Sequence, residues 1–190
     1  MHVAIVNNAS STPDNIIRLL GENSHEVFDY SQADKIDSTR FDLLILTGGS
    51  QFPIVSNIDK LQTEIDLIQN SAIPLLGICY GCELITVAFG GTLKDRGDHT
   101  QTREALEITV LKDDPIFLGH TTFMAYDAHR WIVDQVPMTL DILAQSVHGP
   151  EVVRHKERPI YGFQFHPERM LDETLGNEIF DAFVRQYVVQ

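Results

Sequence analysis

Residues 74–85 read PLLGICYGCELI, and this order of residues predicts a strand, a sharp turn and a helix. The short apolar run at 75–78, opened by a proline, is typical of a strand that is covered on both faces. Gly77 and Gly81 flank Cys79 two residues before and two residues after it, which is the nucleophile-elbow pattern with cysteine in place of serine. In so tight a turn, a β-carbon at either glycine would collide with the neighbouring strand or helix.

The elbow places Cys79 at the N-terminus of the helix that follows it. Free N–H groups and the helix dipole at such a position favour a thiolate over a thiol, so we expect a lowered pKa for Cys79. The alternative is a buried structural cysteine, which is the commoner role of a lone cysteine. The two glycines and the strand-to-helix context favour the functional interpretation.

The composition is that of an acidic globular chain. Its 190 residues, 43% of them hydrophobic, are enough for a single domain with a sizeable core, residues 1–190. A formal net charge of −13 argues against binding to nucleic acid or to an anionic membrane. No stretch approaches the roughly 18 apolar residues of a membrane span, and residues 1–6 are interpreted as a first strand rather than a signal peptide. Two cysteines spaced three apart cannot staple such a chain, so we expect a reducing cytoplasm.

The first half of the sequence alternates strands and helices. This alternation implies a parallel sheet with helices on both faces. Catalytic groups in such sheets gather at the carboxyl ends of the strands, where Gly48, Gly49 and Cys79 fall. The predicted strands cover residues 3–6, 27–30, 41–46 and 75–78, and the predicted helices cover 14–20, 58–68 and the residues after Cys79.

The pattern changes after residue 92. Residues 104–111 alternate apolar and polar side chains, as a half-exposed strand does. The expected fold class is therefore α/β, a single domain with a mainly parallel sheet and a small antiparallel extension in its second half. Further strands are predicted at 121–126, 140–147, 151–154 and 160–165, and a closing amphipathic helix at 174–188.

A cysteine nucleophile needs a base, and the base needs an orienting group. His166 follows the last predicted strand and should lie at the edge of the sheet where Cys79 lies. Glu168 follows two residues later, and Pro167 stiffens the backbone between them, so the carboxylate can hold one imidazole nitrogen while the other faces the thiol. Considered alone, a surface histidine and glutamate at a strand end would explain this segment as well.

Acyl transfer also needs hydrogen-bond donors for the oxyanion. In an elbow, the residue after the nucleophile supplies one N–H group, here that of Tyr80. Gly49, in the double glycine that ends the third strand, can supply the second. A double glycine by itself is a weak signal, because ordinary tight loops contain it too.

Three segments together resemble the class I (triad) glutamine amidotransferases. The resemblance spans most of the chain and extends to the order and spacing of the segments, which are LTGG at 46–49, GICYG at 77–81 and QFHPE at 164–168. DPIF at 114–117 and PIYG at 159–162 are most similar to the glutaminase part of GMP synthase. A weaker similarity, to the glutaminases of anthranilate and aminodeoxychorismate synthases, rests on VNN at 6–8 with Ser11 and Asn15.

The resemblance implies a flavodoxin-like amidotransferase fold and hydrolysis of glutamine through a thioester on Cys79, without a cofactor or metal. His166 would protonate the departing ammonia and later activate water, with Glu168 orienting it, while Gly49 and Tyr80 hold the oxyanion. Family members pass the ammonia to a synthetase. Because this chain is about the size of the glutaminase part alone, we expect the acceptor site on a partner chain.

The resemblance also marks candidate substrate-binding residues: Gly48, Glu83, His129 and the backbone of Arg130 and Trp131. Glu83 stands where the family has a glutamine that binds the amino-acid end of the substrate. A carboxylate can still hold an ammonium group but repels the α-carboxylate. The loop GSQFP at 49–53 also lacks the proline that usually follows the glycines.

These departures leave the triad intact and the specificity open. The chain could hydrolyse another γ-glutamyl compound or amide, need a partner for activity, or be a catalytically quiet regulatory protein. A relative of the γ-glutamyl hydrolases or of the DJ-1-like proteins would share the elbow, although the DJ-1-like group lacks the His-Pro-Glu segment.

Two other hypotheses use the cysteines differently. Cys79 and Cys82 have the C-x-x-C spacing of a thioredoxin-like dithiol, but that interpretation explains neither Gly81 nor the segment around His166, so Cys82 is interpreted as a packed core thiol. A two-cysteine zinc site with His99 or His166 is weaker still, because four ligands at close spacing are not visible.

Overall fold

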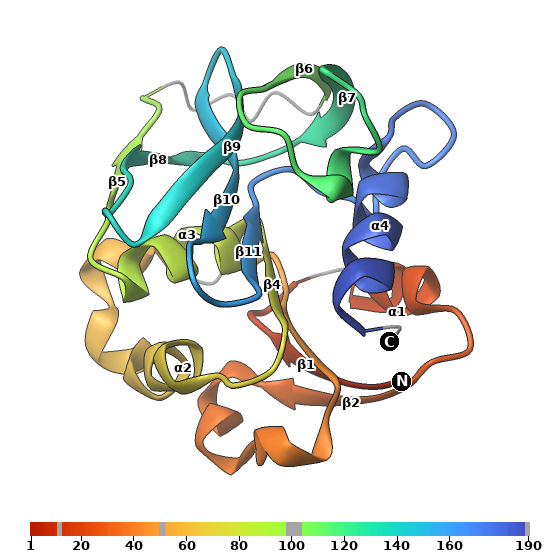
Figure 1. Ribbon diagram of the computed structural model, residues 1–190. Coiled ribbons are helices and arrows are strands. Elements are labelled where there is room, and N and C mark those ends of the chain that lie inside the picture. The colour runs from red at the N-terminus through yellow and green to blue at the C-terminus, as the bar shows by residue number, and fades with distance from the viewer. Residues whose placement is uncertain (11–12, 50–51, 98–103, 189–190) are drawn as a thin grey trace.

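The computed structural model describes residues 1–10, 13–49, 52–97 and 104–188. Its centre is a nine-stranded sheet in the order β2-β1-β3-β4-β11-β10-β9-β6-β7, with helices packed against it (Figure 1). The predicted α/β class is confirmed.

One half of the sheet is parallel. Each neighbouring pair from β2 to β11 runs in the same direction, and the order β2-β1-β3-β4 is that of a flavodoxin-like doubly wound sheet. All four predicted strands of the first half are present, and the elbow strand has the predicted bounds. The five parallel strands are β2 (Ser24–Asp29), β1 (His2–Asn7), β3 (Leu43–Leu46), β4 (Leu75–Ile78) and β11 (Ile160–Phe163).

The other half of the sheet is antiparallel and larger than the small extension that the sequence predicts. Its strands are β10 (Gly149–His155), β9 (Leu140–Ser146), β6 (Glu104–Val110) and β7 (Thr122–Asp127). A separate antiparallel pair, β5 (Thr92–Asp95) with β8 (Trp131–Gln135), was not predicted. Both of its strands are short and largely polar, so they lack the apolar alternation by which the other strands were predicted.

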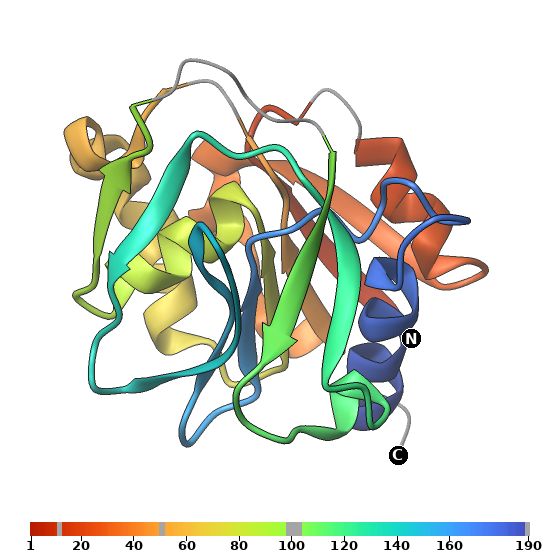
Figure 2. The same cartoon turned by 90° about the horizontal axis from the view of Figure 1, so that it is seen from above.

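Side chains of the parallel strands alternate between two cores. Val3 and Ile5 pack on one side with α1 (Pro13–Leu20) and α4 (Gly176–Val188). The next residues in β1, Ala4 and Val6, pack on the other side with α2 (Ile58–Asn70) and α3 (Tyr80–Ala88). Figure 2 shows the red α1 and blue α4 on one side of the sheet and the yellow α2 and yellow-green α3 on the other. Helices cover both faces, as predicted.

The connections are mostly short turns. Single-turn 3-10 helices occupy Tyr30–Lys35, Ser38–Arg40, Ile54–Ser56 and Pro115–Phe117. The last strand ends at Phe163, two residues earlier than predicted. The chain then crosses to β7, where the backbone N–H of His166 donates to the carbonyl of Tyr126 at 2.9 Å. This crossing carries His166 from the parallel half to the antiparallel half.

Within the described ranges, no helix combines the length and apolar character that crossing a membrane requires.

Candidate active site

Cys79 lies between β4 and α3 in a backbone conformation that L-residues rarely adopt, with φ 50° and ψ −103°. Two backbone hydrogen bonds hold it there. The N–H of Cys79 donates to the carbonyl of Phe163 at 2.7 Å, and the N–H of Glu83 donates to the carbonyl of Cys79 at 3.0 Å. Positive φ at a non-glycine residue stores backbone strain, which is found at nucleophile elbows.

The two glycines of the elbow are needed for close approach. A β-carbon on Gly77 would lie 2.4 Å from the backbone of Gly81, and one on Gly81 would lie 2.5 Å from the carbonyl oxygen of Leu46. Neither backbone atom can move aside without displacing a strand or a helix. The steric argument made from the sequence is therefore confirmed.

His166 and Glu168 form an ion pair, with Nδ1 2.7 Å from Oε1. The Glu168 side chain is only 3% exposed, against 14% for His166. A β-carbon on Gly48 would lie 3.1 Å from Cε1 of His166 and 3.7 Å from Cβ of Cys79. The structure thus brings the nucleophile, the base and the orienting carboxylate together beside Gly48.

The expected lowering of the Cys79 pKa is wrong for this state of the chain. Burial raises the pKa of the thiol well above its usual range, and the nearby carboxylates of Glu83 and Glu168 add to this effect. The backbone N–H of Tyr80 acts in the opposite direction but is outweighed. The helix N-terminus therefore does not make a free thiolate, and the thiol needs a base to accept its proton.

Cys79 opens into a pocket of about 270 Å³. Most of the residues that the sequence marked line it together with Cys79, namely Gly49, Tyr80, Glu83, His129, Arg130 and Trp131. Phe52, Pro53 and Ala128 also line it and were missed. Of the loop at 49–53, residues 50 and 51 lie outside the described residues. A larger hollow of about 620 Å³ between β7 and the start of α4 has none of these residues in its lining.

His129 is buried beneath the pocket as a cation. Its Nδ1 donates to the carbonyl of Trp131 at 2.8 Å, and its Nε2 lies 2.9 Å from Oδ1 of Asp127. Burial opposes the charge, but hydrogen bonds and negative charge from Asp127 and Glu151 outweigh it and raise the pKa of His129 to about 10. Both ring nitrogens therefore carry hydrogens at neutral pH.

Glu83 is 4% exposed and faces this cation. Nε2 of Gln164 donates to its Oε1 at 3.1 Å. Burial raises the pKa of Glu83 to about 7, although the charge of His129 and the hydrogen bond from Gln164 lower it. The position that distinguishes this chain from the amidotransferase pattern thus holds a carboxyl that titrates near neutral pH.

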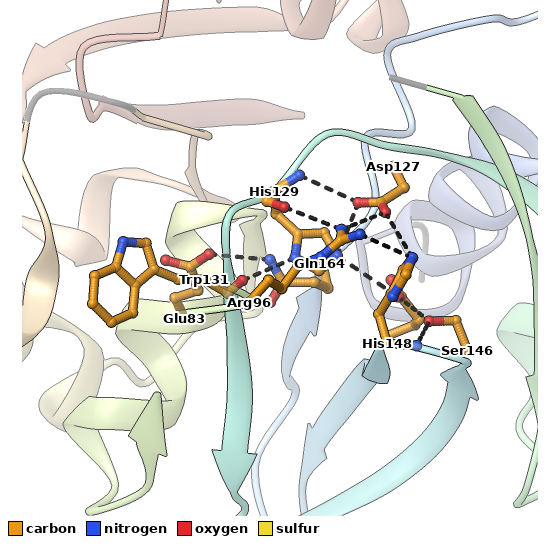
Figure 3. Close-up of polar contacts among 9 residues, drawn as sticks. Glu83, Arg96, Asp127, His129, Trp131, Ser146, His148 and Gln164 are labelled. Atoms are coloured by element: carbon orange, nitrogen blue, oxygen red, sulfur yellow. Dashed lines mark hydrogen bonds and ion pairs between the residues drawn. The ribbon is translucent and has the colours of Figure 1, made fainter. Parts of the chain in front are cut away.

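Behind His129 lies a buried polar network, which Figure 3 shows extending away from Trp131 and Glu83 toward Ser146. Arg96 Nη1 donates to Oδ2 of Asp127 at 3.1 Å, and Arg96 Nη2 lies 3.1 Å from Nε2 of His148. Sequence reasoning missed these residues. The one available signal was the DAH segment at 127–129, because Arg96 joins the network through the unpredicted pairing of β5 with β8.

Arg130 lies at the pocket but its guanidinium is engaged. Its Nε donates to Oδ2 of Asp95 at 2.9 Å, and the side chain is 46% exposed. The group also lies 6.0 Å from the centre of the Trp131 ring. Arg130 is therefore better placed to present its backbone than its charge, as expected from the sequence.

Cys82 packs in the core with 0% exposure. A β-carbon on Gly162 of β11 would lie 2.6 Å from its sulfur, so the thiol fills the space that the glycine leaves. Among the described residues, no group of three or more His, Cys, Asp or Glu side chains is arranged to hold a metal ion, and His99 lies outside them.

Comparisons with known proteins fit this geometry. The model of the family "Glutamine amidotransferase class-I" matches residues 4–186. A subunit of the glutamine-hydrolysing GMP synthase from Methanocaldococcus jannaschii is 34% identical over 173 residues, covering 89% of this chain and 87% of that protein. The corresponding protein of Methanothermobacter thermautotrophicus is 31% identical over 186 residues, covering 95% of each.

Solved structures agree on the fold. A candidate GMP synthase subunit from Thermoplasma acidophilum superposes with a TM-score of 0.82 at 26% identity, over 97% of this chain and 92% of that one. A glutamine amidotransferase from Thermotoga maritima gives 0.79 at 16% identity, over 99% and 98%. The family model spans nearly the whole chain, elbow and His–Glu segment included, and this protein belongs to the class I glutamine amidotransferases.

Proposed function

We propose that this protein hydrolyses the side-chain amide of glutamine through Cys79 and supplies the ammonia to a partner synthetase. The observation that carries the proposal is the meeting of the strained Cys79 with the His166–Glu168 pair beside Gly48. An acyl-transfer centre needs a nucleophile, a base and an orienting group in that arrangement.

The first half of the reaction forms a thioester. The thiol of Cys79 gives its proton to His166 while its sulfur attacks the amide carbon of glutamine. Because burial raises the pKa of the thiol, this transfer has to occur as the substrate binds rather than before. His166 then passes the proton to the leaving nitrogen, the carbon–nitrogen bond breaks and ammonia departs.

The second half returns the enzyme to its starting state. Water gives a proton to His166 and attacks the thioester carbon, the carbon–sulfur bond breaks, and the sulfur of Cys79 recovers the proton as glutamate leaves. Glu168, 2.7 Å from Nδ1 of His166, stabilises the imidazolium that forms in each half. The N–H groups of Gly49 and Tyr80, which both line the pocket, are the proposed donors to the oxyanion.

The amino-acid end of glutamine is proposed to bind at the other side of the same pocket. Glu83 offers a carboxylate to the α-ammonium group, and the backbone of Arg130 and Trp131 offers hydrogen bonds to the α-carboxylate. His129 lies under both and supplies a buried positive charge that offsets the repulsion between Glu83 and the α-carboxylate. Glu83 is thus compatible with glutamine.

The proposed partner is a synthetase of the GMP synthase kind. This rests on relatives that are named as one subunit of glutamine-hydrolysing GMP synthases and that align over most of both chains. We also propose that the reaction takes place in the cytoplasm, where a reducing environment keeps a nucleophilic cysteine as a thiol.

The test is ammonia release from glutamine and from a panel of γ-glutamyl amides, with and without the synthetase partner of a GMP synthase. We expect release from glutamine that increases when the partner is present. Release from a different amide alone would preserve the mechanism and change the substrate. If no compound releases ammonia under any condition, the chain is catalytically quiet and the proposal is wrong.

A further inference from the structure

Glu64 is a buried carboxyl that the proposed reaction does not use. It lies on α2 with 0% exposure, and its Oε1 accepts a hydrogen bond from Nδ2 of Asn8 at 2.9 Å. Two atoms of this pair, Oε2 of Glu64 and Oδ1 of Asn8, are buried without a hydrogen-bond partner in the described part of the chain. Glu64 belongs to no ion pair among the described residues.

A single proton resolves both unpartnered atoms. With Glu64 ionised, both are acceptors, and burying unsatisfied acceptors is costly. With Glu64 as a carboxylic acid, its O–H can donate to Oδ1 of Asn8 while Oε1 still accepts from Nδ2, which gives a paired acid and amide. Burial raises the pKa of Glu64 to about 8, despite the lowering effect of the Asn8 hydrogen bond, so the acid form prevails at neutral pH.

The groups that face Glu64 favour this neutral form. The negative charge of Asp29, at the end of β2, raises the pKa of Glu64 further. Tyr80 on α3 is the other titratable neighbour, with Tyr30 beside it, and burial raises the pKa of the Tyr80 phenol so that it stays neutral. Neither residue provides the positive charge that would ionise Glu64.

Asn8 in turn lies directly against the glycine loop. Its N–H donates to Oγ1 of Thr47 at 3.0 Å, and its Nδ2 approaches the carbonyl of Thr47 at 3.4 Å. A β-carbon on Gly49 would lie 2.2 Å from the carbonyl oxygen of Asn8. The next residue, Ala9, has φ 59°. Any shift of Asn8 therefore moves Gly49.

We propose that Glu64, as a neutral carboxylic acid, is a positioning residue that fixes Asn8 and through it the Gly49 N–H at the oxyanion site. This inference rests on the proposed function, since it assigns a support to the Gly49 donor. The side chain of Glu64 does not touch the substrate. Its effect should appear in the turnover step rather than in the binding of glutamine.

Three variants test the proposal in the full chain, assayed with the synthetase partner if activity requires it. Glu64→Gln keeps both hydrogen bonds to Asn8 with no proton to lose. Glu64→Leu keeps the volume and removes both bonds. Asp66→Leu, on the exposed side of the same helix, is the matched control.

We expect Glu64→Leu to lower kcat by about 10- to 100-fold, as for a displaced oxyanion donor, with KM changed by less than about threefold. Glu64→Gln and Asp66→Leu should stay within about threefold of the original kcat at pH 7. Above about pH 8 the original chain loses the Glu64 proton, so the ratio of the Glu64→Gln activity to the original activity should rise.

The infrared carbonyl band of a protonated carboxylic acid gives a readout independent of catalysis. We expect that band at pH 7 in the original chain and its loss in Glu64→Gln. A folded Glu64→Leu variant with unchanged kcat, a flat activity ratio above pH 8, or an ionised Glu64 at pH 7 would each overturn the inference. If Glu64→Leu does not fold, the ratio and the band decide. Absence of ammonia release from the original chain would instead reject the proposed function.

Discussion

The two halves of the sheet contribute different things to the pocket. The parallel half supplies the backbone geometry of the reaction, through the elbow at Cys79 and the glycine loop that ends at Gly49. The antiparallel half supplies buried charge, through Asp127 on β7 and Glu151 on β10. His166 lies where the chain passes from one half to the other. Reaction chemistry and substrate charge are thus separated within one sheet.

Two buried glutamates show the same contrast. Glu64 lies among neutral partners and titrates at about 8, whereas Glu83 faces the His129 cation and titrates at about 7 despite deep burial. Burial is the largest cause of the raised pKa in both. The presence or absence of a buried cation decides whether the carboxyl can serve as a charge at neutral pH.

Replacing the nucleophile should have the largest effect. Cys79→Ala removes the atom on which the thioester forms, so we expect glutamine hydrolysis to fall by about 10⁴-fold or more. Cys82→Ala is the matched control and should keep most of the activity, because Cys82 packs in the core. Equal losses in the two variants would favour a dithiol mechanism. The measurement is the rate of ammonia release.

Breaking the charge network should most strongly affect the antiparallel half. Asp127→Asn leaves His129 and Arg96 without their shared carboxylate, and losing one partner of a buried pair costs about 4 kcal/mol of folding free energy. Urea denaturation measures this change. Asp134→Asn, which removes only the exposed pair with Lys94, should cost less than about 1 kcal/mol. Similar values for both variants would contradict the role given to Asp127.

Filling the elbow should affect the parallel half through packing alone. In Gly81→Ala the new methyl group meets the carbonyl oxygen of Leu46, so we expect about 2 kcal/mol of destabilisation together with lost activity. Chemical denaturation and ammonia release measure the two effects. A variant with unchanged stability would show that the backbone of β3 can yield and that the close approach is not required.

The substrate side should show the smallest and most pH-dependent effect. Below pH 7 Glu83 gains a proton and loses its attraction for the α-ammonium group, so kcat/KM for glutamine should rise as the pH passes upward through about 7. In Glu83→Gln this rise should disappear, with a difference of about 3- to 10-fold between the two chains above pH 8. The ratio of the two pH profiles isolates Glu83 from groups common to both. A constant ratio would remove Glu83 from the binding site.

The sequence was most informative where function depends on local backbone geometry. The spacing of Gly77, Cys79 and Gly81 is local, and it predicted both the turn and the collisions that exclude other residues. The His166–Glu168 pair is equally local. The expectation of a lowered Cys79 pKa failed because the pKa depends on burial and on Glu83 and Glu168, which only the folded chain places around the thiol.

The charge network could not be predicted for a related reason. Asp127, Glu151 and Arg96 lie far apart in the sequence and meet only through the pairing of antiparallel strands and of β5 with β8. No short motif marks such a contact. The size of the antiparallel half was underestimated because its strands follow one another without the intervening helices that make a parallel sheet easy to recognise.

The central claim is that Cys79 carries the glutamyl group during turnover. Mass spectrometry of peptides from a reaction with glutamine, quenched in acid within the first turnovers, tests it directly. The account predicts an adduct of one γ-glutamyl group on the peptide that contains Cys79, absent in Cys79→Ala and retained in Cys82→Ala. An adduct on Cys82, or steady ammonia release with no adduct on either cysteine, would contradict it.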